Sequence, residues 1–308
     1  MKQYSKWMLT SFIALFLVGC GLPGLSSGNT DTIKVTALST SEGQTTAGII
    51  KELIEHETDY KVDIINNLGT STVTHEAIKR GDADIAGTRY TGTDVSGILG
   101  LPAEKDPQKA LELVQKEFKE RYNMKYYDSF GFANSYSFMV TKETADKYGL
   151  KTISDLKDIA GDLTAGVDSS WMSRDGDGYD DFVKEYGFDF NKVYPMQIGL
   201  VYNALAAGQM DIVLGYSTDG RIQSYDLVVL EDDLHFFPPY DASPLITEET
   251  LKKYPELDEL LERLVGKIST EDMQKLNFEV DDRLKEPAVV AKEFLEVHDY
   301  FKGGQVNE

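Results

Sequence analysis

The sequence predicts an α/β fold built from two similar lobes, and three observations lead to this prediction. Short β-branched segments alternate with amphipathic segments, which is typical of α/β folds with mainly parallel sheets. A similar pattern occurs twice, at residues 77–85 and 204–212. The only cysteine, Cys20, lies near the N-terminus, so the rest of the chain must be held by a hydrophobic core without a disulfide.

The N-terminus is typical of an exported lipoprotein. Lys2 and Lys6 precede an apolar run from Trp7 to Val18, and Gly19-Cys20 follows directly. The run is shorter than the roughly 20 residues that a membrane-spanning helix needs. We therefore predict a signal peptide over 1–19 that ends in a lipobox, with lipidation of Cys20.

A tether rich in Gly and Ser, over 20–31, then separates the predicted anchor from the first strand. We expect this lipid to anchor the protein at the extracytoplasmic face of the cell membrane. Removal of Lys2 and Lys6 with the signal peptide would take the formal charge from −21 to −23. Such an acidic surface argues against nucleic acid as a partner.

Strands and helices alternate from Ile33 onward, and the tail from Thr247 is largely helical by its pattern. Predicted strands are 33–38, 62–66, 84–89, 138–141, 163–167, 193–198, 211–216 and 227–230, and predicted helices include 44–57, 73–80 and 107–122.

Each copy of the repeated pattern reads as a helix, a C-terminal glycine, a tight turn and a strand that opens with Asp. The strands then lead into Tyr90 in one copy and Tyr216 in the other. One such joint is common in α/β proteins, but two suggest two similar lobes. Because ligands of open α/β sheets sit beyond the carboxyl ends of strands, both tyrosines are expected at a shared cleft.

The sequence gives no support to an enzyme, a metal site or a cofactor site. The histidines are scattered without ligand spacing, and no G-x-S-x-G motif is present; they are His56, His75, His235 and His298. The segment 175–180 resembles a calcium loop but departs from that pattern, and it reads better as an acidic loop that caps a helix. No phosphate-binding glycine loop occurs, so an ATPase would be a separate subunit.

Tyrosines at predicted strand ends or in polar turns are the notable feature. They are Tyr90, Tyr136, Tyr216 and Tyr240. A trimethylammonium group cannot donate a hydrogen bond, so the faces of electron-rich rings are its natural partners. Any one tyrosine is more often a packing residue with a hydrogen-bonded hydroxyl.

Several elements together resemble the osmoprotectant-binding proteins of OpuC type from Gram-positive ABC importers. They are the lipobox, Gln44-Thr45 after a glutamate, Tyr90-Thr91-Gly92-Thr93, Phe132-Ala133-Asn134-Ser135-Tyr136 and the segment 215–220. The resemblance implies a type II periplasmic-binding-protein fold, with lobe one at 32–129 plus 237–308, lobe two at 130–236 and two crossings that form a hinge.

The same resemblance implies a ligand and a site. The ligand would be a quaternary-ammonium osmoprotectant such as glycine betaine, carnitine or choline, delivered to an ABC permease. Tyr90, Tyr136, Tyr216 and Tyr240 would form an aromatic cage, with Thr93 and Gln44 near the ligand's carboxylate.

Other readings stay open from the sequence. A binding protein for another small solute, such as an amino acid, would need an acidic anchor for an α-ammonium group, and Asp94 directly follows the Tyr90 to Thr93 element. An enzyme on the same fold or a surface adhesion lipoprotein are further alternatives.

Overall fold

The structure is a computed structural model that describes residues 32–172, 174 and 177–302. The predicted signal peptide, the lipidation site Cys20 and the tether lie outside the described residues. Within these described ranges, no helix has both the length and the apolar character needed to cross a bilayer.

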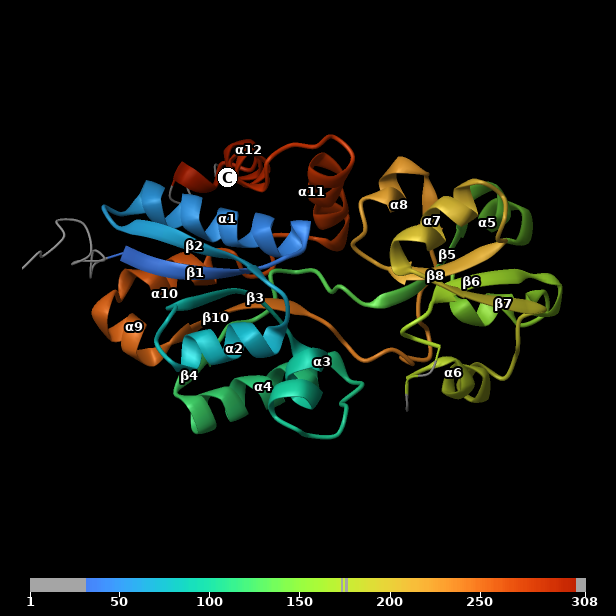
Figure 1. Cartoon of the computed structure of the whole chain (residues 1–308), viewed down its shortest axis with the longest axis horizontal. Coiled ribbons are helices and arrows are strands. Elements are labelled where there is room, and N and C mark those ends of the chain that lie inside the picture. The colour runs from blue at the N-terminus through green and yellow to red at the C-terminus, as the bar shows by residue number, and fades with distance from the viewer. Residues whose placement is uncertain (1–31, 173, 175–176, 303–308) are drawn as a thin grey trace, which may run out of the picture. The chain divides into compact units, whose positions relative to one another are not determined.

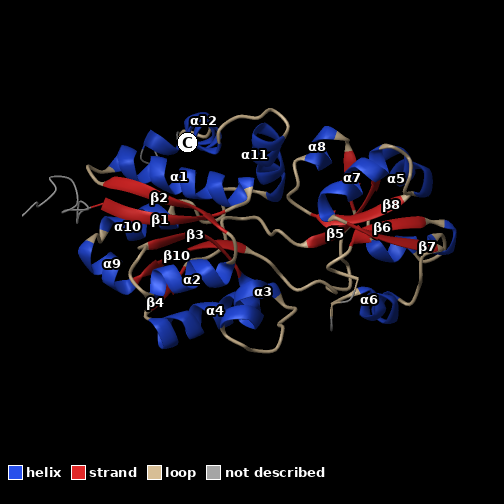
Figure 2. Ribbon diagram, in the orientation of Figure 1, coloured by secondary structure: helices blue, strands red, loops and turns tan. Residues whose placement is uncertain are grey.

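Two mixed sheets form the framework of the described chain (Figures 1 and 2). The first has the strand order β2-β1-β3-β10-β4, and the second has the order β7-β6-β8-β5-β9. The strands are β1 (Thr32–Leu38), β2 (Lys61–Leu68), β3 (Ile85–Tyr90), β4 (Met124–Tyr126), β5 (Tyr136–Thr141), β6 (Thr164–Asp168), β7 (Lys192–Met196), β8 (Ile212–Tyr216), β9 (Leu227–Val229) and β10 (Ala242–Thr247).

Helices occupy most of the connections between strands. They are α1 (Ser41–Glu57), α2 (Ser71–Lys79), α3 (Thr91–Thr93), α4 (Pro107–Tyr122), α5 (Lys142–Tyr148), α6 (Tyr179–Tyr186), α7 (Ile198–Ala206), α8 (Arg221–Ser224), α9 (Glu248–Lys253), α10 (Glu256–Glu262), α11 (Thr270–Asp281) and α12 (Pro287–Val297). A π-helical turn (Asp94–Ile98) and three 3₁₀ turns (Ile153–Leu156, Ala160–Asp162 and Tyr300–Lys302) complete the described helices. The tail after β10 is helical, as predicted.

Both sheets are buried on two faces. In β3, Ile85 packs in the core beneath α1 and α12, while its neighbour Ala86 packs in the core beneath α2 and α4. In β8, Leu214 and Val213 likewise face two different cores. Central strands covered on both sides read as continuous apolar runs, which is why these strands are visible in the sequence.

The two copies of the repeated pattern fold alike. Each helix is followed by a left-handed glycine, Gly81 (φ 76°) or Gly208 (φ 66°), and then by a strand. Asp84 exchanges hydrogen bonds with the backbone of Lys34, its carboxylate accepting from the Lys34 N–H at 2.8 Å. Asp211 makes the same pair of bonds to Thr164, also at 2.8 Å. The aspartate therefore locks each strand to its parallel neighbour.

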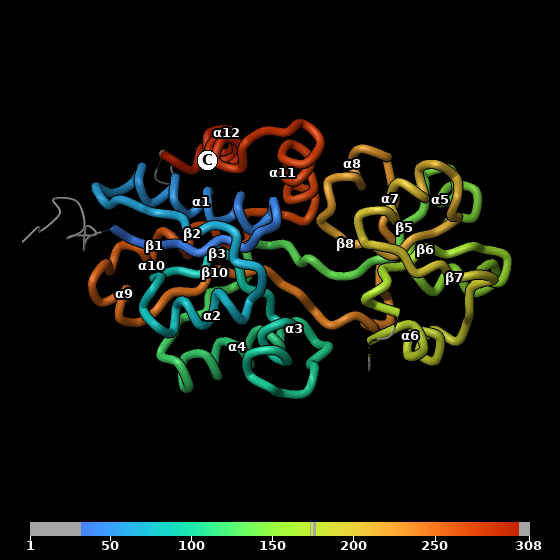
Figure 3. The backbone as a smooth tube through the Cα atoms, viewed as in Figure 1, coloured from blue at the N-terminus to red at the C-terminus, as the bar shows by residue number. Residues whose placement is uncertain are grey.

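The chain passes twice between the sheets, and the two passes are hydrogen-bonded to each other (Figure 3, green and orange). Asn134 N–H donates to the Tyr240 carbonyl at 3.1 Å, and Ala242 N–H donates to the Phe132 carbonyl at 3.0 Å. Phe132 lies in the core of the first sheet, while Phe237 lies in the core of the second.

Candidate functional site

A pocket of about 420 Å³ is lined by side chains from both sheets and from the two crossing segments. Its volume is in the range usual for small-molecule sites. The lining residues are Leu38, Thr40, Tyr90, Thr93, Ser96, Gly97, Asn134, Tyr136, Arg174, Tyr216 and Tyr240. The structure thus brings together five of the six residues that the sequence analysis selected for the ligand.

Tyr136 and Tyr216 form the side of the pocket that belongs to the second sheet. They face each other in the antiparallel pairing of β5 with β8, and their ring centroids are 5.2 Å apart. The Tyr136 hydroxyl donates to Asp168 at 2.6 Å. Burial and this hydrogen bond raise the pKa of Tyr136 above its ordinary value, so the ring stays a neutral phenol.

Tyr90 and Tyr240 reach the pocket from the first sheet and the second crossing. Tyr90 pairs with Ala242, two residues after Tyr240, where β10 joins β3. Gly92 N–H donates to the Pro239 carbonyl at 2.8 Å, and a Cβ at Gly92 would lie 2.5 Å from that oxygen. Only glycine allows this approach, which holds the two segments together beside the pocket.

A buried ion pair stabilises the turn from Tyr90 to Thr93. The Arg89 guanidinium bonds Asp94 through two nitrogens, with Nε at 2.9 Å, and it also donates to the Ser71 carbonyl at 2.8 Å. Arg89 is 1% exposed and Asp94 is 0% exposed. Burial raises the pKa of Asp94, and Arg89 opposes that effect. Because Asp94 is enclosed and already paired, it is not placed to anchor the ammonium group of an amino acid.

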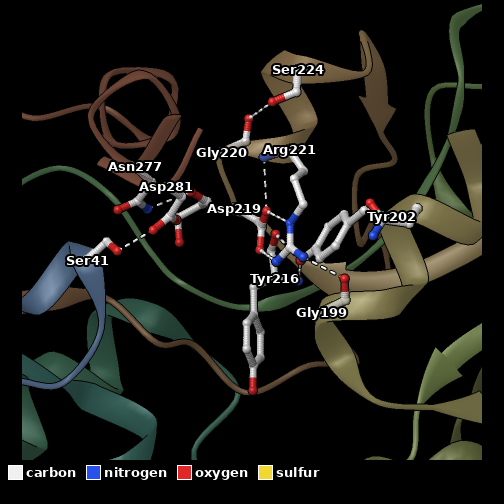
Figure 4. A network of polar contacts seen from close by, with 12 residues as sticks. Ser41, Gly199, Tyr202, Tyr216, Asp219, Gly220, Arg221, Ser224, Asn277 and Asp281 are labelled. Carbon is white, nitrogen blue, oxygen red and sulfur yellow. Dashed lines mark hydrogen bonds and ion pairs between the residues drawn. The ribbon is translucent and has the colours of Figure 1, made fainter. Parts of the chain in front are cut away.

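A second hollow of about 270 Å³ adjoins the first and shares Thr40, Asn134 and Tyr216 with it. Arg221 forms a bidentate ion pair with Asp219 next to this hollow, at 2.6 and 2.8 Å. Its guanidinium lies 4.4 Å from the ring centroid of Tyr202. Figure 4 shows the ring of Tyr216 pointing away from this ion pair, so the pair supports the Tyr216 segment without contacting the ring.

The comparisons with known proteins agree with this architecture. The profile of the family described as "Substrate binding domain of ABC-type glycine betaine transport system" matches residues 31–297. The chain belongs to this family. It is 56% identical to the carnitine transport binding protein OpuCC of Listeria monocytogenes over 300 residues, which are 97% of each chain. It is 34% identical to the ergothioneine transport permease/ergothioneine binding protein EgtU of Helicobacter pylori, over 85% of this chain and 47% of that protein.

A solved structure gives the same result for the fold. The crystal structure of a glycine betaine/carnitine/choline ABC transporter protein superposes with a TM-score of 0.86 at 56% identity, covering 87% of this chain and 99% of that chain. This confirms the predicted periplasmic-binding-protein fold. Membership of the glycine betaine transport family also confirms an extracytoplasmic substrate-binding protein, with a small-molecule ligand and a permease partner, rather than an enzyme.

Arg174 is the charged residue among the lining residues that the sequence did not reveal. Its guanidinium donates to the Tyr240 hydroxyl at 3.1 Å, pairs with Asp177 at 2.6 Å and lies 5.7 Å from the Tyr136 ring centroid. The sequence gives little indication of this role, because Arg174 directly precedes an acidic segment that is typical of a helix cap. In a glycine betaine family protein it places a positive charge at the edge of the aromatic pocket.

Gln44 is the one selected residue that does not line the pocket. It lies in the first turns of α1, and its side-chain amide donates to the Ser39 carbonyl at 3.3 Å. Its predicted contact with the ligand therefore stays a prediction.

Proposed function

We propose that this protein captures quaternary-ammonium osmoprotectants, namely glycine betaine, carnitine or choline, and delivers them to its permease. The observation that carries the proposal is that Tyr90, Tyr136, Tyr216 and Tyr240, from four separate segments, line one pocket. Ring faces attract a cation that has no hydrogen-bond donor, and several rings around one position exclude water from it. The printed names of the relatives, for carnitine and for glycine betaine, carnitine and choline, support the same ligand class.

The carboxylate of glycine betaine or carnitine needs a different partner from the methyl groups. Arg174 lines the same pocket and carries the charge that would pair with it. Thr93 also lines the pocket and can donate a hydrogen bond without adding a charge. We propose that these two residues hold the acidic end of the ligand, and that choline, which lacks a carboxylate, uses only the rings and the hydroxyl of Thr93.

An amino acid is the weaker candidate. Its ammonium group donates hydrogen bonds and is normally met by a carboxylate. None of the described residues that line the aromatic pocket is acidic, and Asp94 is buried in its ion pair with Arg89.

We further propose that two lobes close on the ligand. Lobe one would comprise 32–129 plus 237–308 and lobe two 130–236, as predicted from the sequence, with the crossings as the hinge. Phe132 packs in the core of the first sheet and Phe237 in the core of the second. This packing supports crossings that lie a few residues after the predicted boundaries at 130 and 236. Closure would remove water around the cation and strengthen its attraction to the rings.

The test is calorimetric titration of the detergent-purified full-length protein with glycine betaine, carnitine, choline and proline betaine. Glycine is the matched control, because it keeps the carboxylate of glycine betaine and lacks the three methyl groups. We expect binding of one or more quaternary amines and no measurable binding of glycine. No heat with any of the four amines, on folded protein, would overturn the proposal.

We propose that the protein is held at the membrane by a lipid on Cys20. The support is the signal sequence that ends at Gly19-Cys20. Cells labelled with a fatty acid should incorporate the label into the parent protein and not into Cys20→Ala. Label retained by the variant would refute lipidation at this residue.

A further inference from the structure

Glu42 is a buried carboxylate that touches the aromatic pocket from behind. It lies in the first turn of α1, after the N-cap Thr40, and is 2% exposed. The Tyr90 hydroxyl donates to its Oε1, and Asn134 Nδ2 donates to the same oxygen at 3.1 Å. Asn277 Nδ2 lies 3.5 Å from Oε2. Glu42 therefore connects the cage tyrosine Tyr90 with the first crossing and with α11.

Among the described residues, no positive side chain pairs with this carboxylate. In the part of the chain that the structure describes, no ion pair joins Glu42 to a Lys, Arg or His, whereas Asp94, Asp177 and Asp219 are each paired with an arginine. Burial raises the pKa of Glu42, and the hydrogen bonds from Tyr90, Thr218, Asn134 and Asn277 act against that increase. A buried carboxylate with several donors and no counter-ion is costly unless another positive charge approaches it.

A quaternary amine in the adjacent pocket would supply such a positive charge. Tyr90 separates Glu42 from the pocket, with its hydroxyl on the carboxylate and its ring among the lining residues. A phenol that donates to a carboxylate has a more electron-rich ring, which strengthens its attraction for a cation. The charge of the carboxylate would also act on a cation in the pocket through space.

We propose that Glu42 supplies a negative charge that raises the affinity of this cleft for cationic choline relative to zwitterionic glycine betaine, acting through Tyr90, whose ring it also positions. The proposal rests on the proposed function, because it assumes that a quaternary amine occupies the pocket. Glu42 is a positioning and specificity-determining residue here, since no contact with the ligand is required of it.

A purely structural role makes a different prediction. Glu42 also receives hydrogen bonds from groups on the first crossing and on α11, so its loss could loosen the cleft. A loosened cleft weakens every ligand in proportion. Loss of a negative charge instead weakens choline, which is cationic, more than glycine betaine, whose carboxylate is repelled by the same charge.

The experiment compares Glu42→Gln with the parent, using the detergent-purified full-length protein and titrations with choline and with glycine betaine. We expect choline to bind about tenfold more weakly and glycine betaine at most about threefold more weakly. Glu42→Asp keeps the charge and shortens the side chain, so it should weaken both ligands alike and preserve their ratio. Thermal unfolding of each variant, without ligand, shows that the chain is folded.

Asp281→Asn is the matched control. Asp281 is another acidic residue of the adjoining hollow, and it accepts from Ser41 rather than from a cage tyrosine. If a general acidic field attracts the ligand, this variant will change the ratio as Glu42→Gln does, and the route through Tyr90 is wrong. An equal loss of both ligands in Glu42→Gln would also overturn the proposal while leaving the proposed function intact. Failure of the parent to bind choline or glycine betaine would overturn the proposal for Glu42, and failure to bind any of the four quaternary amines would overturn both.

Discussion

Tyr90 and Tyr216 end two strands with the same local sequence pattern, yet they stand in different electrostatic surroundings. The two regions share the same features before the tyrosine. Each has a left-handed glycine and an aspartate that hydrogen-bonds the backbone of the neighbouring strand. The Tyr90 hydroxyl then donates to a buried carboxylate, Glu42, which forms no ion pair with any of the described residues. The Tyr216 ring packs against Tyr136, whose hydroxyl meets Asp168.

The ion pairs beside the two tyrosines differ in the same way. Arg89 and Asp94, next to Tyr90, are fully buried, while the side chains of Arg221 and Asp219, after Tyr216, are 29% and 13% exposed. A repeated backbone motif thus places two equivalent rings at one pocket. The residues around each ring then decide how strongly it attracts a cation and how rigidly it is held.

The largest difference is expected in stability. Asp94→Ala leaves the Arg89 guanidinium buried and unpaired, and should lower the free energy of unfolding by about 3–5 kcal/mol. Asp219→Ala leaves a partly exposed arginine that water can reach, and should cost no more than about 2 kcal/mol. Denaturant unfolding of both variants measures this difference. Equal losses would mean that the burial of the first pair does not matter.

The next difference concerns affinity for the quaternary amine. Tyr90→Leu and Tyr216→Leu should each cost about 1–2 kcal/mol, or roughly tenfold in Kd, because each removes one ring from the cation. Tyr216→Phe should bind nearly as well as the parent. Tyr90→Phe should bind more weakly than Tyr216→Phe, because Glu42 loses its donor. Calorimetry with glycine betaine measures the Kd of each variant. Equal losses of affinity for the Leu and Phe changes at both sites would show that hydroxyl groups, not ring faces, provide the binding.

A smaller effect is expected from pH. Burial raises the pKa of Glu42, and a bound cation favours the ionised carboxylate and lowers that pKa. Binding then releases a proton, so the affinity for choline should rise as pH increases through the titration of Glu42 and should be flatter in Glu42→Gln.

Other titratable or charged groups also line the two hollows. They are Asp219 and Asp281 in the adjoining hollow, with Arg221 paired to Asp219, and Arg174, Tyr90, Tyr136, Tyr216 and Tyr240 in the aromatic pocket. The pKa of Tyr90 is raised well above its ordinary value, so it stays protonated, but burial also raises the pKa of Asp281. The variant Asp281→Asn should therefore keep the rise that Glu42→Gln removes. If the affinity of Glu42→Gln for choline still rises with pH, another titrating group causes the rise.

The smallest effect tests the part in which the two regions agree. Asp84→Ala and Asp211→Ala each remove a carboxylate that accepts from the backbone of the neighbouring strand. Each should lower the unfolding free energy by about 0.5–1.5 kcal/mol. The loss should be slightly larger for Asp84, because its carboxylate also accepts from the Thr250 hydroxyl at 3.2 Å. A much larger loss at one site than at the other, in the same denaturant series, would show that the two motifs are not equivalent.

Features encoded in short segments were predictable from the sequence. The repeated motif revealed both strands and both tyrosines, because a glycine turn and a buried strand depend on neighbouring residues. The predicted start of α1 was less accurate. The helix begins at Ser41 with Thr40 as its cap, rather than at Gln44. β10 was not predicted, because Pro244 interrupts its apolar pattern and its strand character depends on β3 and β4.

Features that depend on distant segments were not predictable. Arg174 reaches the pocket through contact with Tyr240, 66 residues away. Glu42 receives its donors from positions as far apart as Tyr90, Asn134 and Asn277. Arg174 belongs to no local motif, and Glu42 appears in the sequence only as the glutamate before Gln44-Thr45. Only the folded chain shows that Arg174 contacts Tyr240 while Glu42 accepts from Tyr90.

The central claim is that ring faces in this pocket hold a cation, and one paired titration tests it most directly. Choline and 3,3-dimethylbutan-1-ol have nearly the same shape, but the second replaces the charged nitrogen by carbon. Our account predicts that the full-length protein binds choline at least about tenfold more tightly than the neutral alcohol, because only choline has a charge for the rings to attract. Equal affinity for the two compounds would contradict the account, since the pocket would then be recognising shape and apolar surface alone.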